Sequence, residues 1–426
     1  MQKSSGYKIP ADYYIVFMIC AVFVVLAFIL DTPAQIAGGY YKINLSRSVL
    51  VTDYIALGGI GAALLNSAIS GLMFLILLIR HKHPPSGIIV ASLWTTMGFS
   101  LFGKNLFNVL PILFGVWLYA KVNRRKFSDF FVQAMLSATI APLVSEIAFL
   151  EEGFSLGRIA AAYGVGVFIG FIFPVVAETV KRMHMGYCLY NCGMAGGFIA
   201  TFCVGLLRSV GIQILPENIW DTSHTALLAT FAYVLAAALI AYGMIRDRPA
   251  NALGKFKQLL GEKDREDNDY LTKYGSTCYI NIGAMCMAAT SAMLLLKIPI
   301  NGPILGGIFT VAGFAANGKH LRNVLPILLG SILATDLNYL EQTAPSNCLA
   351  MLFSTGLAPI AGKYGWRWGI VVGFLHVSMA IFIGQINGGL NLYNNGFAGG
   401  FVALTIVPLI EYSRSMVARY KSEKLI

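Results

Sequence analysis

Long apolar runs separated by short polar stretches fill most of the chain, and this pattern predicts helices that cross a membrane. A run of about 20 apolar residues is long enough to span the hydrocarbon core of a bilayer as a helix. Seven runs lie in each half of the chain. They cover residues 12–30, 52–79, 86–102, 105–121, 131–150, 157–180 and 185–207 in the first half, and 223–245, 276–297, 300–316, 321–336, 346–361, 368–386 and 389–411 in the second. The expected fold class is an all-α integral membrane protein.

The second half of the chain repeats the first. The motif Gly-Lys-x-Leu-x-Asn-Val-Leu-Pro-Ile-Leu-x-Gly occupies residues 103–115 and again 318–330, each time after Gly-Phe. Leu-Tyr-Asn-x-Gly-x-Ala-Gly-Gly-Phe occurs at 189–198 and at 392–401. Long matches at a nearly fixed offset indicate an internal duplication. We assign residues 1–214 to a first transmembrane repeat and 215–426 to a second.

The charge of the loops predicts that the two repeats have opposite orientations. Basic residues are enriched in cytoplasmic loops, and an odd number of crossings in each repeat inverts the second copy. Basic residues cluster around Arg80, around Arg125, in the linker 246–275 and at the C-terminus, whereas acidic residues mark the opposite side at Glu151, Glu152, Glu217, Asp221 and Glu341. We therefore expect a plasma-membrane protein with both termini and the linker 246–275 in the cytoplasm.

Several of the runs are short for a helix that crosses the membrane, which indicates segments that enter the membrane and turn back. Runs 86–102 and 321–336 flank the two Gly-Lys pairs. Each pair can therefore be the tip of a re-entrant hairpin, which returns to its own side and leaves the inverted relation unchanged. The expected architecture is two inverted-topology repeats with re-entrant hairpins and broken helices.

The composition excludes several classes of protein. Hydrophobic residues make up 57% of the chain and charged residues 12%, against about 25% charged in soluble domains. The formal charge of +11 lies in short loops between apolar runs, a positive-inside pattern rather than a nucleic-acid footprint. Seven cysteines lie mostly in or beside apolar runs, without the spacing of a disulfide framework or metal site. Since enzyme signatures are also missing, we expect neither an enzyme nor a cofactor or metal.

Two lysines in the repeated motif are the first candidates for chemistry. Lys104 and Lys319 each follow a glycine, Gly103 and Gly318, between two apolar half-segments. A lysine at mid-depth costs about 2.5–3.5 kcal/mol on insertion scales and is usually retained for a partner or a function. Together with free N–H groups at a half-helix N-terminus, the pair can form an anion site. The alternative is a surface turn from which the lysines reach the lipid headgroups.

Asparagines beside glycines form the second candidate group. Asn191 and Asn394 follow tyrosines in the second motif, and glycines such as Gly193 and Gly396 come next. Glycines within an apolar run permit either a helix break or very close helix packing. We expect the break, with the amides orienting a solute together with Asn108 and Asn323 of the first motif.

Pro142 and Pro359 indicate a third interrupted element in each repeat. Nearby hydroxyl residues can satisfy the carbonyls that proline leaves without a partner. We expect a kinked helix here rather than a cation site. Glu146 and Glu178 are candidate proton carriers, although their places near the ends of runs favour the interface. His184 is expected at the surface. His376 is expected to be a hydrogen-bonded histidine of the core.

The two motifs support a family resemblance. Gly-Lys-x-x-x-Asn-Val-Leu-Pro-Ile and Leu-Tyr-Asn-x-Gly-x-Ala-Gly-Gly-Phe resemble an uncharacterised family of bacterial multi-pass membrane proteins, a domain of unknown function, over nearly the whole chain. This resemblance implies a membrane location and no activity. The stretches around Asn191 and Asn394 also look faintly like urea-transporter-type inverted repeats, but the Gly-Lys elements do not, and no urea-site residue is carried over.

These observations favour a secondary transporter for a small polar, anionic solute. Its site would lie near the midplane between the inverted repeats, with alternating access by one repeat moving against the other. Its substrate-binding residues would be Gly103, Lys104, Asn108, Asn191, Gly193, Gly318, Lys319, Asn323, Asn394 and Gly396. The solute, a coupling ion (H+ or Na+), lipid and a second copy of the chain are the partners considered. The alternatives are a passive urea-type channel for a neutral solute and a membrane-embedded accessory subunit.

Overall fold

The computed structural model describes residues 8–48, 51–150, 154–212, 214, 219–263, 268–337 and 343–423. Every regular element in these ranges is a helix, which confirms the all-α class. Nine helical stretches of this described part are long and apolar enough to cross a membrane. The protein is therefore a multi-pass membrane protein. The acidic residues Glu151, Glu152, Glu217 and Glu341, which we expect on the outer side, lie outside the described residues.

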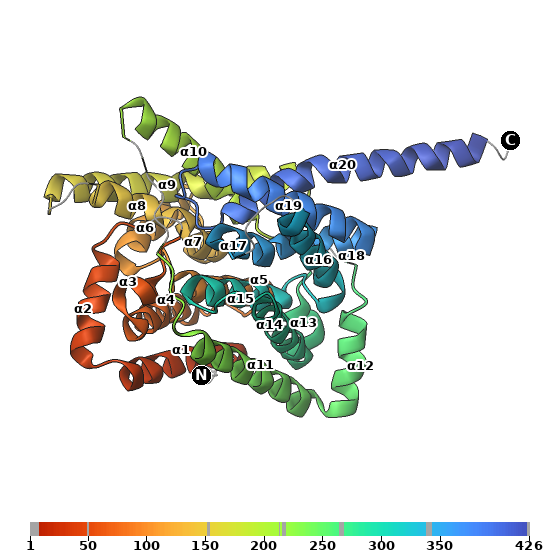
Figure 1. Cartoon of the computed structure of the whole chain (residues 1–426), viewed down its shortest axis with the longest axis horizontal. Coiled ribbons are helices and arrows are strands. Elements are labelled where there is room, and N and C mark those ends of the chain that lie inside the picture. The colour runs from red at the N-terminus through yellow and green to blue at the C-terminus, as the bar shows by residue number, and fades with distance from the viewer. Residues whose placement is uncertain are drawn as a thin grey trace, which may run out of the picture.

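The helices follow one another in the same order in both halves of the chain (Figure 1). The first half contains α1 (Ala11–Leu30), α2 (Pro33–Asn44), α3 (Tyr54–Gly58), α4 (Ile60–Arg80), α5 (Gly87–Phe99), α6 (Leu106–Val122), α7 (Phe131–Leu136), α8 (Ala141–Ala148), α9 (Leu156–Met183) and α10 (Asn191–Ser209). The second contains α11 (Thr225–Asp247), α12 (Pro249–Leu259), α13 (Tyr270–Tyr274), α14 (Cys278–Leu295), α15 (Gly302–Gly313), α16 (Leu321–Leu337), α17 (Pro345–Ser354), α18 (Ala358–Tyr364), α19 (Trp366–Ile386) and α20 (Asn394–Glu423). Each helix of the first half thus has a counterpart ten places later, as a duplication predicts.

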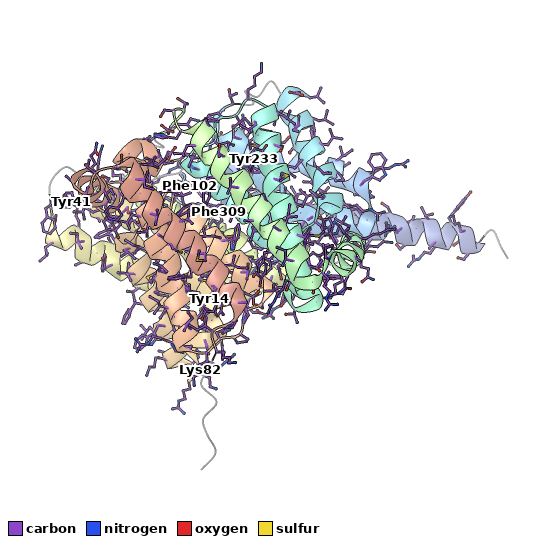
Figure 2. The ribbon with its side chains drawn as sticks, turned by 90° about the horizontal axis from the view of Figure 1, so that it is seen from below. Tyr14, Tyr41, Lys82, Phe102, Tyr233 and Phe309 are labelled. Atoms are coloured by element: carbon purple, nitrogen blue, oxygen red, sulfur yellow. The ribbon has the colours of Figure 1, made fainter. Side chains whose placement is uncertain are left out.

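Apolar side chains cover the outer face of the spanning helices. On α1 the exposed residues include Tyr14 (53%), Met18 (58%) and Ile29 (71%). Figure 2 shows α1 and α11 next to each other on the face seen from below, with Tyr14 and Tyr233 on these helices. Exposed apolar surface on this scale is a liability in water and is suited to a lipid environment.

The hairpin helices α5 and α15 pack against each other at the centre of the molecule (Figure 1). A Cβ atom at Gly98 would lie 2.7 Å from the carbonyl oxygen of Gly306, and one at Gly313 would lie 3.3 Å from Ala91 Cα. These two contacts pair increasing residue numbers in α5 with decreasing residue numbers in α15, so the two helices are antiparallel. Counterpart helices that run antiparallel are what inverted repeats require, and the inverted orientation itself stays a prediction.

The glycines after Asn191 and Asn394 do not break a helix, and our expectation of a break there is wrong. Helices α10 and α20 begin at these asparagines and continue through the glycines. A Cβ atom at Gly193 would lie 2.9 Å from Gly396 Cα and 2.6 Å from the Tyr393 carbonyl oxygen. The glycines therefore let the two helices touch, which is the close-packing alternative.

The element at Pro142 is interrupted as predicted. A 3₁₀ segment, Ser137–Ile140, separates α7 from α8, and Thr355–Leu357 separates α17 from α18. Ser354 and Thr355 donate to the carbonyls of Met351 and Leu352 at 2.6 and 2.7 Å, so hydroxyls satisfy carbonyls near the interruption.

Two aspartates, the buried Asp53 and the half-buried Asp269, tie each hairpin to the opposite half of the chain. Asp269 caps α13 and accepts from the N–H of Gly87, the first residue of α5, at 2.8 Å. Its counterpart Asp53 caps α3 and accepts a hydrogen bond from the N–H of Gly302, the first residue of α15. A carboxylate at a helix N-terminus satisfies free N–H groups and complements the helix dipole. The two halves therefore hold each other by reciprocal contacts.

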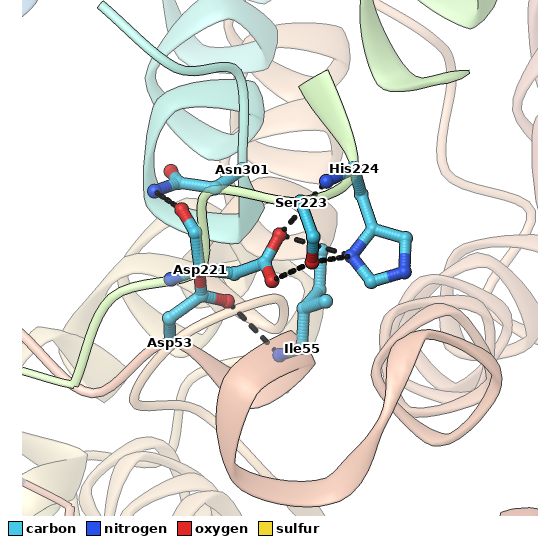
Figure 3. Close-up of polar contacts among 6 residues, drawn as sticks. All are labelled: Asp53, Ile55, Asp221, Ser223, His224 and Asn301. Carbon is cyan, nitrogen blue, oxygen red and sulfur yellow. Dashed lines mark hydrogen bonds and ion pairs between the residues drawn. The ribbon is translucent and has the colours of Figure 1, made fainter. Parts of the chain in front are cut away.

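The loop that leads into the second half strengthens the Asp53 contact (Figure 3). Asp53 also accepts from the N–H of Asp221 at 3.1 Å, and Asn301 donates to the Asp221 carbonyl oxygen at 3.0 Å. The Asp221 carboxylate accepts from Ser223 at 2.6 Å, and His224 Nδ1 lies 2.9 Å from it. Burial alone would raise the pKa of the Asp221 carboxyl, but these hydrogen bonds hold it below its ordinary value.

Candidate functional site

Each Gly-Lys pair forms a tight buried turn. Gly103 and Gly318 have φ angles of 87° and 91°, which side-chain-bearing residues rarely adopt. Asn108 and Asn323 donate to the carbonyl oxygens of these glycines at 3.0 Å each. The two asparagine amides therefore hold the turns together instead of reaching a solute directly.

A further pair of asparagines braces each turn from a neighbouring helix. Asn66 on α4 donates to the carbonyl of Lys104 at 2.7 Å, and Asn281 on α14 donates to that of Lys319 at the same distance. These hydrogen bonds hold the backbone of both turns, and they therefore fix the position from which each lysine side chain extends.

The lysines are buried, not at the surface. Lys104 and Lys319 are both 0% exposed, and α5, with 13 residues, is only about 20 Å long at 1.5 Å per residue. A bilayer core is about 30 Å thick. The hairpin α5–α6 therefore ends inside the protein, and the surface-turn alternative does not describe either lysine.

Each lysine contacts a tyrosine of the other half. Lys104 Nζ donates to Tyr393 Oη at 2.5 Å and lies 4.6 Å from the centre of its ring. Lys319 Nζ donates to Tyr190 Oη and lies 4.4 Å from that ring. The contacts combine a charge-assisted hydrogen bond with a cation–π interaction. Because they are reciprocal, both halves contribute to both lysine sites.

The interrupted helices supply the remaining acceptors. Lys104 Nζ lies 3.3 Å from the Met135 carbonyl oxygen, just before the 3₁₀ segment. Lys319 Nζ donates to Thr355 Oγ1 at 2.8 Å, within the equivalent segment. Among the residues that the structure describes, no carboxylate pairs with either ammonium. Two lysine side chains are thus buried near polar but uncharged partners. A positive charge on either is costly there, and an anion would relieve that cost.

A cavity of about 290 Å³ lies between the two halves, and we call it the central cavity. Tyr190 and Tyr393 both border it, together with Gly193 and Gly396 at the contact of α10 with α20. The phenols that the lysines contact therefore face a space large enough for a small solute. Asn191 borders the cavity as well, whereas in the second motif it is Asn395, not the predicted Asn394, that does so.

The central cavity has a mouth at which exposed and half-buried residues border it. Asp129, Glu178 and Lys181 border it there. The lining residues that the second half contributes, Phe353 and Asn395 among them, are all buried. Asn391 and Cys188 occupy equivalent positions and make equivalent contacts: Asn391 donates to the Gly193 carbonyl oxygen at 3.0 Å, and Cys188 Sγ donates to that of Gly396 at 3.8 Å. The exposed part of the lining therefore belongs to the first half.

The remaining predicted residues have structural partners. Asn191 Oδ1 lies 3.0 Å from His184 Nε2, and Asn394 Oδ1 accepts from Asn387 at 2.6 Å. Our expectation that His184 is at the surface is wrong, because it is 0% exposed. His376 is buried and lies 3.1 Å from Asn395 Oδ1, so the prediction of a hydrogen-bonded core histidine is confirmed.

Of the two glutamates, Glu178 is exposed at the cavity mouth, whereas Glu146 is buried and paired with Arg47. The expected position at the membrane interface therefore fits only Glu178.

Sequence reasoning missed the two tyrosines and Asn391. Tyr190 and Tyr393 precede the asparagines in both copies of the motif, so their repetition was visible. Their role was not, because each contacts a lysine far away in the sequence and in the other half.

The comparison with known proteins now places the chain in a family. The family model described as Protein of unknown function (DUF1576) matches residues 32–209 and 248–412, most of the chain. The protein belongs to the DUF1576 family. Both matched segments of this DUF1576 protein begin directly after corresponding helices, α1 and α11, and end within corresponding helices, α10 and α20. No curated protein and no solved structure matches the chain. The resemblance to an uncharacterised family is confirmed, whereas the likeness to urea transporters and the bacterial origin stay predictions.

Proposed function

We propose that this DUF1576 protein is a secondary transporter that moves a small anion through the central cavity. The observation that carries the proposal is the pair of buried lysines without a carboxylate partner, each held against a phenol that borders the cavity. Binding sites of transporters lie typically where two repeats meet near the midplane, and buried charge there marks the substrate or ion path. An anion between the two phenols would receive O–H donors backed by two cations.

The unequal exposure of the cavity lining favours a carrier over a passive channel. A pore needs a continuous path, whereas here the mouth at Lys181 is open and the lining residues of the second half are buried. A second state with the mouth on the side of the second half would deliver the solute to the other side. Under the proposed orientation, the open mouth faces the cytoplasm. The coupling ion, H+ or Na+, belongs to the same proposal.

Transport by purified protein in proteoliposomes tests this function. Currents on a solid-supported membrane would be recorded with formate, lactate, succinate, nitrate and phosphate, and light-scattering with urea and glycerol. The expected result is a saturable, protein-dependent signal for at least one anion that depends on an H+ or Na+ gradient. Unsaturated flux of urea or glycerol without any anion signal would contradict a carrier and support the channel. Silence with all seven probes would favour an accessory subunit.

A further inference from the structure

A second cavity, of about 310 Å³, lies beside the end of α12 and the start of α16. Lys263, Arg322 and Lys363 border it, together with Trp366 and the buried His320. We call it the linker cavity, because Lys263 belongs to the linker between the two halves. None of the residues that border the central cavity also borders the linker cavity, so the two are separate sites.

The corresponding place in the first half is closed by an ion pair. By the offsets of the duplication, Arg47 corresponds to Lys263, and Glu146 corresponds to Lys363. Arg47 donates to Glu146 Oε2 at 2.7 and 3.0 Å, and the glutamate side chain is 1% exposed. In the second half both positions carry a lysine. Like charges repel, so this pair cannot close the gap.

The aromatic packing of the first half is replaced as well. Phe107 on α6 lies with its ring centre 5.1 Å from that of Phe149. Their counterparts are Arg322 and Trp366, and the tryptophan is 60% exposed. A phenyl ring has thus been exchanged for a guanidinium group within an otherwise repeated motif. The second copy is specialised at this place in charge and in shape.

The nearby carboxylates are already engaged by other groups. Lys273 and Tyr274 contact Glu262, which borders the cavity. Glu411 accepts from Lys363 at 2.9 Å. Neither Lys263 nor Arg322 forms an ion pair within the part of the chain that the structure describes. The cavity therefore presents cations that these carboxylates leave unneutralised.

We propose that the linker cavity binds a phosphate group. Two cations without an ion pair, Lys263 and Arg322, lie around one concave surface beside the paired Lys363 and suit a group with more than one negative charge. A guanidinium group can bind two phosphate oxygens at once. A phospholipid headgroup and a soluble phosphate ester share this chemistry. Basic pockets between helices at a membrane surface recognise headgroups. The site is independent of the transport function.

Two binding measurements on the full chain separate the sources of phosphate. In the first, delipidated protein would be titrated with phosphatidylglycerol or phosphatidylcholine and bound lipid counted by native mass spectrometry. In the second, glycerol 3-phosphate would be titrated in neutral detergent and followed by calorimetry. Lys263→Glu, which puts a carboxylate into the lining of the cavity, and Arg322→Phe, which copies Phe107, are the test variants. Lys257→Glu on α12 is the matched control, since it is exposed and lies outside the cavity.

Phosphatidylglycerol binding assigns a lipid to the cavity, and binding of glycerol 3-phosphate assigns a soluble ligand. In either case both test variants should weaken binding at least tenfold, while Lys257→Glu stays within twofold of the wild type. Thermal unfolding of each variant checks that it is folded, and Lys263 is exposed enough to be replaced safely. The proposal is overturned if neither probe binds in preference to phosphatidylcholine. It is equally overturned if folded Lys263→Glu and Arg322→Phe bind as the wild type does.

Discussion

At the scale of single residues, the two lysine–tyrosine contacts are the most unusual feature of the molecule. Lys104 and Lys319 reach across from their own half to Tyr393 and Tyr190 of the other. A buried ammonium keeps its charge only if surrounding oxygens replace the water that it has lost. The phenols are the oxygens that also face the central cavity, so they link the buried charge to the place where a solute would bind.

Replacing Tyr393 by Phe should destabilise the protein, because it removes an acceptor from a buried ammonium while keeping the ring. A hydrogen bond to a charged group contributes about 1.5–3 kcal/mol. We expect a loss of roughly 2 kcal/mol in the free energy of unfolding, together with weaker anion transport. Tyr412→Phe on exposed α20 is the control. Equal thermal unfolding of the two variants in detergent would argue against this contact.

At the scale of elements, glycines set how closely corresponding helices approach. Helices α10 and α20 meet at Gly193 and Gly396, and α5 and α15 meet at Gly98 and Gly306. In each case a backbone atom of the partner helix occupies the space that a Cβ atom would need. The contact of α10 with α20 forms part of the wall of the central cavity, since Gly193 and Gly396 border it.

Gly193→Ala should therefore separate α10 from α20. The new methyl group would lie 2.6 Å from the Tyr393 carbonyl oxygen, a backbone atom that can move only with its helix. Overpacking of this kind costs about 1–3 kcal/mol. Gly205→Ala, in the same helix, has nothing within 4 Å of the added atom and should be neutral or slightly stabilising. Thermal unfolding of both variants would decide, and the account fails if Gly193→Ala is as stable as Gly205→Ala.

How far the sequence predicts this molecule depends on the distance over which residues act. The duplication, the class of fold and the lysines of the hairpins follow from local patterns, because each motif lies within one short stretch. The partners of those lysines do not, since Tyr393 lies 289 positions from Lys104. The local sequence could not decide whether the glycines after Asn191 break a helix or let it pack closely against another helix, because both structures need a residue without a side chain. The linker cavity depends on how Arg322 differs from Phe107, which matters only once the two halves are superposed.

At the scale of the whole molecule, two related halves hold each other by reciprocal contacts but differ in how far they expose the central cavity. Asp53 and Asp269 each cap a hairpin helix of the opposite half. In the same way, the lysine of each half contacts a tyrosine of the other half. Against this symmetry stands the lining of the central cavity, whose exposed residues all come from the first half. A protein built from two similar halves can rest with the cavity open on one side.

Thiol labelling should reveal this difference in access. In a cysteine-free background, Gln133→Cys at the open mouth should react quickly with a membrane-impermeant maleimide applied from one side of the membrane only. Asn391→Cys, at a position that is 0% exposed, should react at least tenfold more slowly from either side. Rapid labelling of Asn391→Cys from the opposite side, in protein that still unfolds cooperatively, would mean that the contact between the halves is open on that side.

The measurement that tests the central claim most directly is anion transport by lysine variants. Lys104→Met and Lys319→Met keep most of the side-chain volume and remove the charge, and the exposed Lys42→Met serves as the control. With the anion that gives a current in proteoliposomes, we expect at least a tenfold loss for each single variant and no current for the double variant, while Lys42→Met behaves as the wild type. A folded double variant that transports the anion at the wild-type rate would contradict the account.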